Sequence, residues 1–219
     1  LLLAFSGDGS AYQVGKHQPM KLAAMEGLYN GEKGAPLVAF GILNPQKEVD
    51  NNEDPYLFDI SIPYGLSLLA ERDINAFVPG INDIIDGGYT YTDYNGQTKT
   101  ALSFYEKKER GEAAIGALRK YKLAKEAGND SLKNAAYNVL QENFEYFGYG
   151  FMKDHNEVVP PVALTFYAFH IMVILGGYFI LFFLVVLHFL NRDARNKYKF
   201  ESQKWFMYIA IISVPLVYI

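Results

Sequence analysis

The chain has 219 residues, a formal net charge of −4 and no cysteine. The lack of cysteine excludes disulfides, thiolate zinc sites and cysteine-ligated iron–sulfur clusters within these residues. Aromatic residues make up 16 % of the chain, with 17 Tyr and 16 Phe, and tyrosine is favoured where a membrane meets water. These properties favour a membrane protein, and no nucleic-acid partner is expected.

The chain is expected to begin and end inside membrane helices. Residues 1–5 read LLLAF, without an initiator Met or a basic stretch, which is not typical of a signal peptide. We predict that residues 1–6 are the end of an earlier membrane helix. Residues 205–219 are an uncharged apolar run of 15 residues, too short to span alone, and are expected to start another helix. Both ends therefore look like truncation points in a larger protein.

A long polar segment, residues 7–158, follows the first helix and contains recognisable local signals. Residues 89–94 have the sequence YTYTDY and precede Asn95 and Gly96. Because Asn-Gly accepts the positive φ angles of a type I′ turn, this stretch predicts a β-hairpin. Residues 101–127 are rich in Glu, Lys, Ala and Leu and end at Gly128, which predicts a helix with a glycine C-cap.

A second helix is predicted over about 131–147, capped by Asn129 or Asp130 and ended by Gly148. Apolar residues recur along it at helical spacing. The two helices are expected to form a small hairpin packed on its neighbours. The apolar stripe of the second helix consists of Leu132, Ala136, Val139, Leu140 and Phe144.

One complete membrane span is predicted over residues 159–190, which contain no Asp, Glu, Lys or Arg across 32 residues. About 20 apolar residues suffice to cross a bilayer as a helix. The link 191–204 carries five basic and two acidic residues, a net charge of +3, whereas residues 27–158 carry 20 acidic and 13 basic residues, a net charge of −7. Because short basic links lie on the cytoplasmic side, the segment 7–158 is expected outside the cytoplasm.

Two groups of residues are candidates for chemistry. Lys21 and Glu26 lie five residues apart beside the first membrane helix, about 140° apart around a helix, so they can flank one pocket but are not an ideal ion pair. In the span, His170 is costly to bury in an apolar helix, and Met172 carries a sulfur that can ligate haem iron. His170 and Met172 point in different directions, about 200° apart. Judged alone, Lys21 and Glu26 read as solvated helix charges, and His170 and Met172 as packing residues.

Several short motifs, taken together, change this interpretation. Residues 7–12 (GDGSAY), Gln18 and residues 21–26 (KLAAME) resemble the opening of the quinol loop in subunit I of cytochrome bd-type quinol oxidases, where the pattern is close to GDxSxY, then QxxKLAAxE. Residues 40–42 (FGI), 62–66 (IPYGL) and 148–150 (GYG) resemble later parts of that loop, and 169–173 (FHIMV) is similar to the family's FRIMV. The order and spacing agree along essentially the whole chain.

The resemblance implies an all-α membrane protein, a helix bundle with a long extracytoplasmic loop in the bacterial inner membrane. It implies that Lys21 and Glu26 act in quinol oxidation, with Glu26 accepting a proton and Lys21 binding the quinol oxygen or tuning the charge. It implies that Met172 is an axial, metal-coordinating ligand of haem b558. His170 stands where the family has Arg, and we expect it to contact a haem propionate with a charge that depends on pH.

The resemblance also implies components that lie outside these residues. Haems b595 and d, with their ligands, and the histidine partner of Met172 belong to other parts of the subunit. A second large subunit and a small single-helix subunit are the expected partners, with quinol as the electron donor, oxygen as the acceptor and lipid around the span.

Two alternatives remain open at the level of the sequence. The first is an extracytoplasmic binding or sensor domain held by membrane helices, which needs no haem. The second is a transporter fragment in which His170 relays protons, and residues 176–177 (GG) are a weak indication of a helix break there. Absorbance of a b-type haem that is lost on Met172→Ala distinguishes the oxidase from both.

Overall fold

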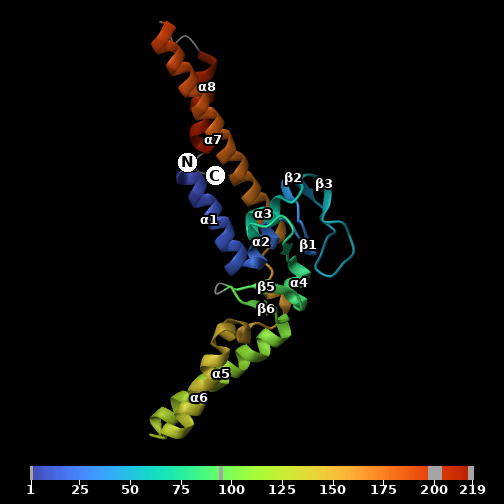
Figure 1. Cartoon of the computed structure of the whole chain (residues 1–219), viewed down its shortest axis with the longest axis vertical. Helices are drawn as coiled ribbons and strands as arrows, with labels where there is room; N and C mark the ends of the chain where they lie inside the picture. Colours follow the sequence, from blue (N-terminus) through green and yellow to red (C-terminus); the bar gives the residue numbers. More distant parts are fainter. Residues whose placement is uncertain (1, 94–95, 197–203, 217–219) are drawn as a thin grey trace. The chain divides into compact units, whose positions relative to one another are not determined.

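A computed structural model describes residues 2–93, 96–196 and 204–216. It consists of two compact units, residues 1–166 and 167–219, and each is described by itself (Figure 1). The boundary between them falls inside the long helix α7 (Val162–Asn196). The first turn of that helix therefore belongs to the first unit.

The first unit begins with helix α1 (Leu2–His17), which continues well past residue 6, where the membrane helix was expected to end. Pro19 then starts the short helix α2 (Pro19–Met25), in agreement with the preference of proline for the first helical turn. Two further short helices, α3 (Gly65–Glu71) and α4 (Ile81–Asp86), complete this part of the unit. Helix α3 packs against α1, and α4 packs against α2.

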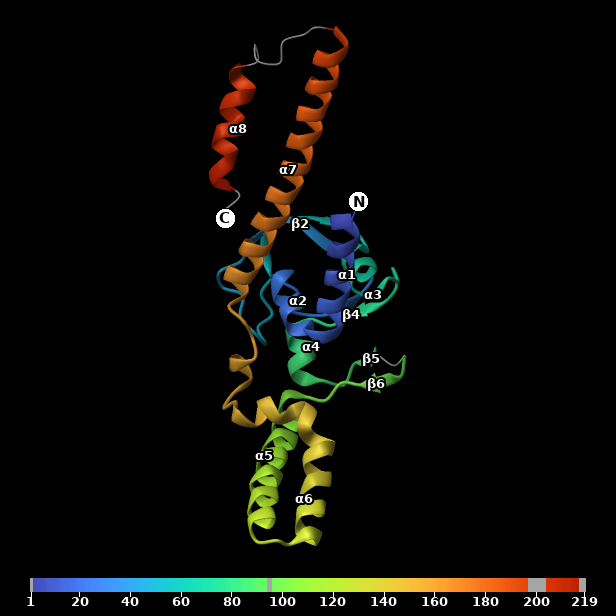
Figure 2. The ribbon, with the colours of Figure 1, turned by 90° about the vertical axis from the view of Figure 1, so that its left-hand side faces the viewer.

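The described residues are mainly helical, as predicted, but they also contain three two-stranded antiparallel ribbons, of which only one was predicted (Figures 1 and 2). The ribbons pair β1 (Glu32–Lys33) with β4 (Phe77–Val78), β2 (Leu37–Leu43) with β3 (Tyr56–Ile62), and β5 (Thr90–Thr92) with β6 (Thr98–Thr100). The physical reason is local: β2 and β3 are rich in β-branched and aromatic residues, which favour extended backbone. The β5–β6 ribbon confirms the predicted hairpin, whose turn residues 94–95 lie outside the described residues.

The β2–β3 ribbon has two different faces. The register pairs Val38 with Ser61 and Leu43 with Tyr56, and this face packs on Phe166 in the first turn of α7. The other face carries exposed apolar side chains, including Phe40, Phe58 and Ile60. Irregularities in the register near Val38 and Leu43 interrupt the strict alternation along the strands.

Helices α5 (Phe104–Glu126) and α6 (Asp130–Asn143) form the predicted hairpin, and both views show them side by side. Ser103 and Glu106 form a capping box at the start of α5, Gly128 has a φ of 68° after its end, and Asn129 caps α6. The α-helix ends at Asn143, earlier than predicted. The chain continues as the 3-10 helix η1 (Phe144–Phe151) and a short second one, η2 (His155–Glu157).

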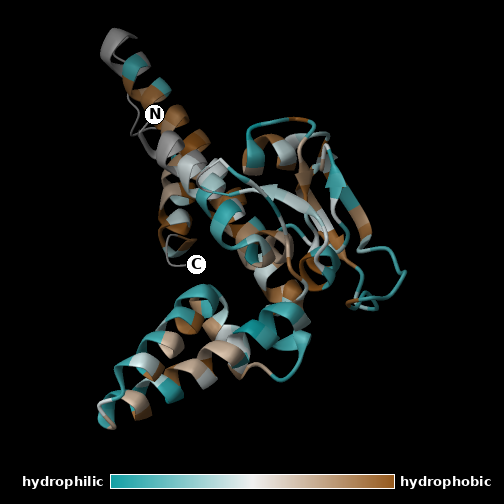
Figure 3. Cartoon of the chain, turned by 60° about the horizontal axis from the view of Figure 1, so that its bottom comes forward, coloured by the Kyte–Doolittle hydropathy of each residue, from teal (hydrophilic) through white to brown (hydrophobic). Residues whose placement is uncertain are grey.

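The apolar stripe of the second helix is mostly exposed. Leu132, Val139 and Phe144 are exposed, and only Ala136 of the stripe is buried. Most of the buried residues of the two helices are small, and Figure 3 colours much of the ribbon of the hairpin as hydrophilic. The small buried residues are Gly111, Ala114, Ala117, Ala124 and Ala136.

The closest approach between α5 and η1 is a contact between two glycines. A Cβ added to Gly111 would lie 2.4 Å from the backbone nitrogen of Gly150, and a Cβ added to Gly150 would lie 2.5 Å from the backbone carbonyl carbon of Gly111. Neither position has room for a side chain. The GYG motif at 148–150 therefore has a packing role at its second glycine.

Helix α7 is the one helix, among the described residues, that is long and apolar enough to cross a membrane. Its 35 residues correspond to about 50 Å at 1.5 Å per residue, more than the ~30 Å of a hydrocarbon core. Helix α8 (Lys204–Leu216) is apolar but shorter. Half of the predicted basic link 191–204, namely residues 197–203, lies outside the described residues.

Within the second unit, α7 packs against α8 through aromatic and polar contacts. The rings of Phe182 and Phe206 stack with centroids 5.2 Å apart. The hydroxyls of Tyr178 and Ser213 form a hydrogen bond of 2.5 Å, and Ser213 also donates to the Ile209 carbonyl. These contacts satisfy polar groups that would otherwise face apolar surroundings.

Candidate functional site

Helix α2 carries both candidate residues of the loop and is buried on most of its surface. Met20 and Ala23 belong to one apolar cluster of the first unit, which also contains residues of α4 and α5. Leu22 belongs to a second cluster, with residues of α3 and β4. Helix α2 is therefore held between two parts of the core.

Lys21 and Glu26 occupy opposite environments on this helix. The Lys21 side chain is exposed, whereas Glu26 is among the most buried side chains of the chain, with 2 % of its surface accessible. The structure thus places Lys21 at the surface and Glu26 in the interior, in keeping with the large angle expected between them. It does not bring the two side chains together as an ion pair.

The end of α2 is a Schellman motif that fixes the backbone of Glu26. The Leu28 N–H donates to the Ala23 carbonyl at 2.8 Å, and the Gly27 N–H donates to the Ala24 carbonyl at 3.4 Å. Gly27 has a φ of 60°, a left-handed conformation that favours glycine at this position. Glu26 is the C-cap residue of this motif.

The Glu26 carboxyl group lies in an apolar environment without a good partner. Neither carboxyl oxygen accepts a hydrogen bond of ordinary geometry from the described residues. Burial raises the pKa of Glu26 from 4.5 to about 7, and the backbone N–H of Val38 offsets only part of this effect. A carboxyl group with a pKa near 7 can accept and release protons at physiological pH.

Residues that are distant in the sequence pack beside Glu26. Val38, Leu43 and Phe166 form a buried apolar cluster, and Tyr56 packs on it. The Tyr56 hydroxyl donates a short hydrogen bond to the backbone carbonyl of Glu26. The sequence reasoning missed Tyr56, because nothing in its local sequence distinguishes it from the other aromatic residues of the strand.

A separate cavity of about 600 Å³ lies elsewhere in the first unit, and neither Lys21 nor Glu26 lines it. Its walls come from the end of α1, the β5–β6 ribbon, α5 and η1, and include Lys16, Tyr89, Tyr91 and Lys107. Lys16 is paired there with Glu71 at 2.5 Å. The cavity is therefore distinct from the environment of the buried carboxyl group.

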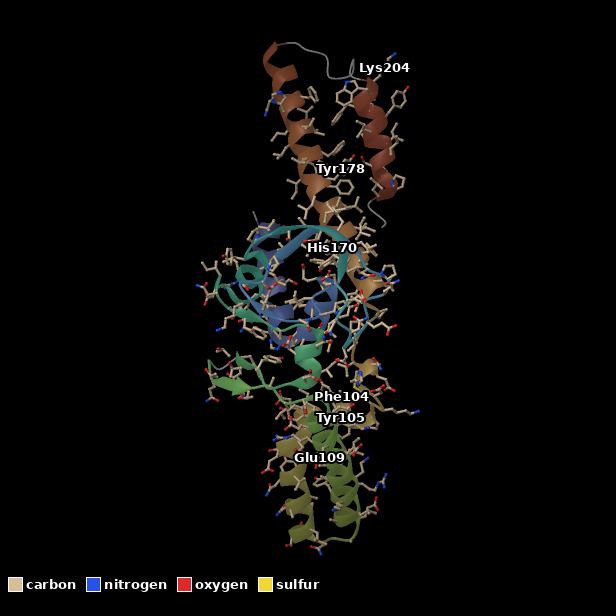
Figure 4. The ribbon with its side chains drawn as sticks, turned by 90° about the vertical axis from the view of Figure 1, so that its right-hand side faces the viewer. Phe104, Tyr105, Glu109, His170, Tyr178 and Lys204 are labelled. Atoms are coloured by element: carbon tan, nitrogen blue, oxygen red, sulfur yellow. The ribbon has the colours of Figure 1, made fainter. Side chains whose placement is uncertain are left out.

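The candidate haem residues lie on α7, where Figure 4 labels His170. His170 is buried, with 7 % of its surface accessible, whereas Met172 is 61 % exposed. The two side chains therefore differ in environment, as their spacing predicts. The thioether of Met172 is accessible on an apolar helix, so this side chain is suited to ligate a haem iron. No cluster of three or more His, Cys, Asp or Glu suited to a metal ion occurs among the described residues.

Comparison with known proteins places the chain in a family. The family model described as "Cytochrome bd terminal oxidase subunit I" matches residues 1–219. The chain belongs to this family. The cytochrome bd assignment agrees with the membrane span and with the motif order of the sequence.

Individual relatives agree with the family. The chain is 27 % identical to the cytochrome bd-II ubiquinol oxidase subunit 1 of Escherichia coli (strain K12) over 230 residues, which cover 97 % of this chain and 38 % of the relative. It is 28 % identical to the cytochrome bd ubiquinol oxidase subunit 1 of Bacillus subtilis (strain 168) over 219 residues, or 98 % of this chain and 31 % of the relative.

A third relative matches a shorter part of the chain. The putative cytochrome bd menaquinol oxidase subunit I of Bacillus subtilis (strain 168) is 38 % identical over 82 residues, which cover 37 % of this chain and 17 % of the relative. The chain thus spans about a third of the length of the first two cytochrome bd relatives.

Proposed function

We propose that this chain is the quinol-oxidising part of the haem-bearing subunit of a cytochrome bd quinol oxidase. The observation that carries the proposal is the Glu26 carboxyl group, which is buried, has no hydrogen-bond partner of ordinary geometry among the described residues, and has a pKa raised to about 7 despite the nearby Val38 N–H. Such a group is suited to proton transfer near neutral pH. Family membership supplies the reaction in which a proton must be accepted.

Quinol oxidation releases two protons and two electrons. In the proposed reaction, residues of this chain accept the first proton. Glu26, in its ionised form, accepts a proton from a quinol hydroxyl. Lys21, at the surface of the same helix, hydrogen-bonds a quinol oxygen and stabilises the negative charge that develops on it. The second proton leaves to water on the extracytoplasmic side.

Met172 is the residue that would hold haem b558 through its thioether, and the haem would supply one-electron redox chemistry there. His170 is the proposed contact of a haem propionate, in the place where the family has Arg. Haems b595 and d would be held by other parts of the subunit, and they would supply the chemistry that reduces oxygen to water. The proposed assembly contains a second large subunit and a small single-helix subunit in the bacterial inner membrane, with residues 7–158 outside the cytoplasm.

The family match leaves the sensor and transporter alternatives without a supporting observation. The proposal is tested on the assembled, full-length oxidase with the substitution Glu26→Ala. Quinol-driven oxygen consumption is expected to collapse, while the reduced-minus-oxidised haem spectrum persists. Unchanged turnover would contradict the proposed role of Glu26 as a proton acceptor. Separately, Met172→Ala is expected to remove the b558 band, and a retained band would contradict its role as ligand.

A further inference from the structure

One hydrogen bond links the proposed proton acceptor to a residue that is remote in the sequence. The last carbonyl groups of a helix lack partners within the helix and must find them elsewhere. At the end of α2, the Glu26 carbonyl finds its partner in the Tyr56 hydroxyl of strand β3. This bond acts on the same residue whose side chain we propose as the base.

The Tyr56 hydroxyl is itself held in place from several sides. Tyr56 pairs with Leu43 across the ribbon, and its ring packs on Phe166 with centroids 5.9 Å apart. Burial, followed by the nearby charges of Glu26 and Asp59, raises the pKa of Tyr56 far above its ordinary value. The hydroxyl therefore remains protonated and serves as a hydrogen-bond donor.

The backbone beside this bond has no space to adjust. A Cβ added to Gly27 would lie 2.8 Å from the Tyr56 hydroxyl and 3.1 Å from a methyl group of Leu43. The hydroxyl thus fills the space left by the glycine that ends the helix. As a result, the position of the Glu26 peptide group depends on where the Tyr56 ring is anchored.

We propose that Tyr56 is a positioning residue for quinol oxidation: its hydroxyl fixes the peptide group of Glu26 and so keeps the carboxyl group in its apolar, water-excluded environment. The inference rests on the proposed role of Glu26. Tyr56 itself neither gives nor takes a proton in the reaction. Its contribution is to keep Glu26 a stronger base than a carboxylate that can reach water.

Loss of the hydroxyl has a defined consequence for the pH dependence. A freed Glu26 peptide group lets the carboxyl group reach water, so its pKa falls towards 4.5. The acidic limb of the pH–rate profile then moves to lower pH, while the maximal rate falls because the base is weaker. The other ionisable groups that face Tyr56 are Asp59 on the same strand and Tyr29, after α2, and both remain in the variant.

The test is Tyr56→Phe in the assembled, full-length oxidase, which removes the hydroxyl and keeps the ring on Phe166. Quinol-driven turnover is expected to fall roughly five- to tenfold, in line with the loss of one buried hydrogen bond, with an unchanged haem spectrum. The matched control is Tyr89→Phe, because Tyr89 is also partly buried but lies in a different cluster, away from Glu26. The control is expected to keep the native pH–rate profile.

A second measurement follows the carboxyl group directly and does not require turnover. The infrared carbonyl stretch of protonated Glu26, identified by its absence in Glu26→Gln, is titrated in native enzyme and in Tyr56→Phe. A lower midpoint in Tyr56→Phe is expected. An unchanged midpoint overturns the proposal, even if turnover falls, because the hydroxyl then acts on structure alone.

The parallel Glu26→Gln variant separates this inference from the proposed function. If Glu26→Gln is inactive while Tyr56→Phe behaves as native enzyme, the role of Tyr56 is wrong and that of Glu26 stands. If Glu26→Gln turns over quinol at the native rate, the proposed function of Glu26 fails, and the role of Tyr56 fails with it.

Discussion

Replacing Glu26 by Gln is expected to stabilise the protein at alkaline pH while it abolishes quinol oxidation. The pKa of Glu26 is about 7 in the folded chain, against an ordinary 4.5. Between these values the folded state holds a proton that the unfolded state has released, so stability decreases as pH rises through this interval. At 1.36 kcal/mol per pH unit, the decrease is about 3 kcal/mol, complete somewhat above pH 7 and absent below pH 4.5.

The assay is thermal unfolding of the assembled oxidase, native and Glu26→Gln, at a series of pH values from 4.5 to 8. Because glutamine cannot ionise, the variant should not lose stability in this way. The difference between the unfolding temperature of the variant and that of the native enzyme should therefore grow with pH. A chain of this size alone would show a growth of roughly 6 to 12 °C, and the growth is smaller in the larger assembled oxidase, because the same free energy shifts the midpoint of a larger protein less. Glu32→Gln, at an exposed position of β1, is the control and should show no such growth. A Glu26→Gln difference that stays constant with pH would refute the reasoning.

Three further predictions concern the stability of the first unit, measured as the free energy of unfolding. Ser67→Ala is expected to destabilise it by about 1–3 kcal/mol, because the buried hydroxyl accepts a hydrogen bond from the Ala35 N–H at 2.8 Å; a smaller loss would mean that water replaces the hydroxyl. Ser103→Ala should cost about 1 kcal/mol through loss of the capping box at α5, and Ser103→Thr should restore most of it. Gly150→Ala should destabilise the first unit by about 1–3 kcal/mol or more, because the added Cβ would lie 2.5 Å from the backbone of α5. Gly148→Ala, with nothing within 4 Å of the added Cβ, should not, and equal effects at both glycines would contradict the packing argument.

The features that local sequence determines were predictable. Gly128 and Asn129 mark the turn between α5 and α6, because a left-handed C-cap and a side-chain N-cap depend only on neighbouring residues. The β5–β6 hairpin follows in the same way from the Asn-Gly dipeptide in the sequence between its strands. The long apolar helix α7 follows from composition alone.

The features that depend on distant contacts were not predictable. The apolar stripe of α6 did not indicate which of its residues are buried. The buried residues of α5 and α6 include small ones such as Ala114 and Ala136, whereas the larger apolar residues of α6 remain exposed. The β2–β3 ribbon was missed because apolar residues occupy both of its faces and irregular pairing interrupts the period of two.

At the candidate site, the sequence identified Glu26 by resemblance but not its environment. That carboxyl group is buried, and the neighbouring Gly27 lies against Leu43 and Phe166, the second of which is 140 residues away from Glu26 in the sequence. The Tyr56 hydrogen bond likewise joins residues 30 positions apart. The haem roles of His170 and Met172 remain predictions of the resemblance.

The contact between Gly111 and Gly150 has a consequence for how such sequences diverge. Each glycine is required because the backbone of the other occupies the space of its side chain, so a substitution at one is not relieved by a smaller residue at the other. No single or double exchange with another amino acid keeps this spacing. In homologous chains we expect the two positions to be retained together, or lost together where α5 or η1 is remodelled or deleted.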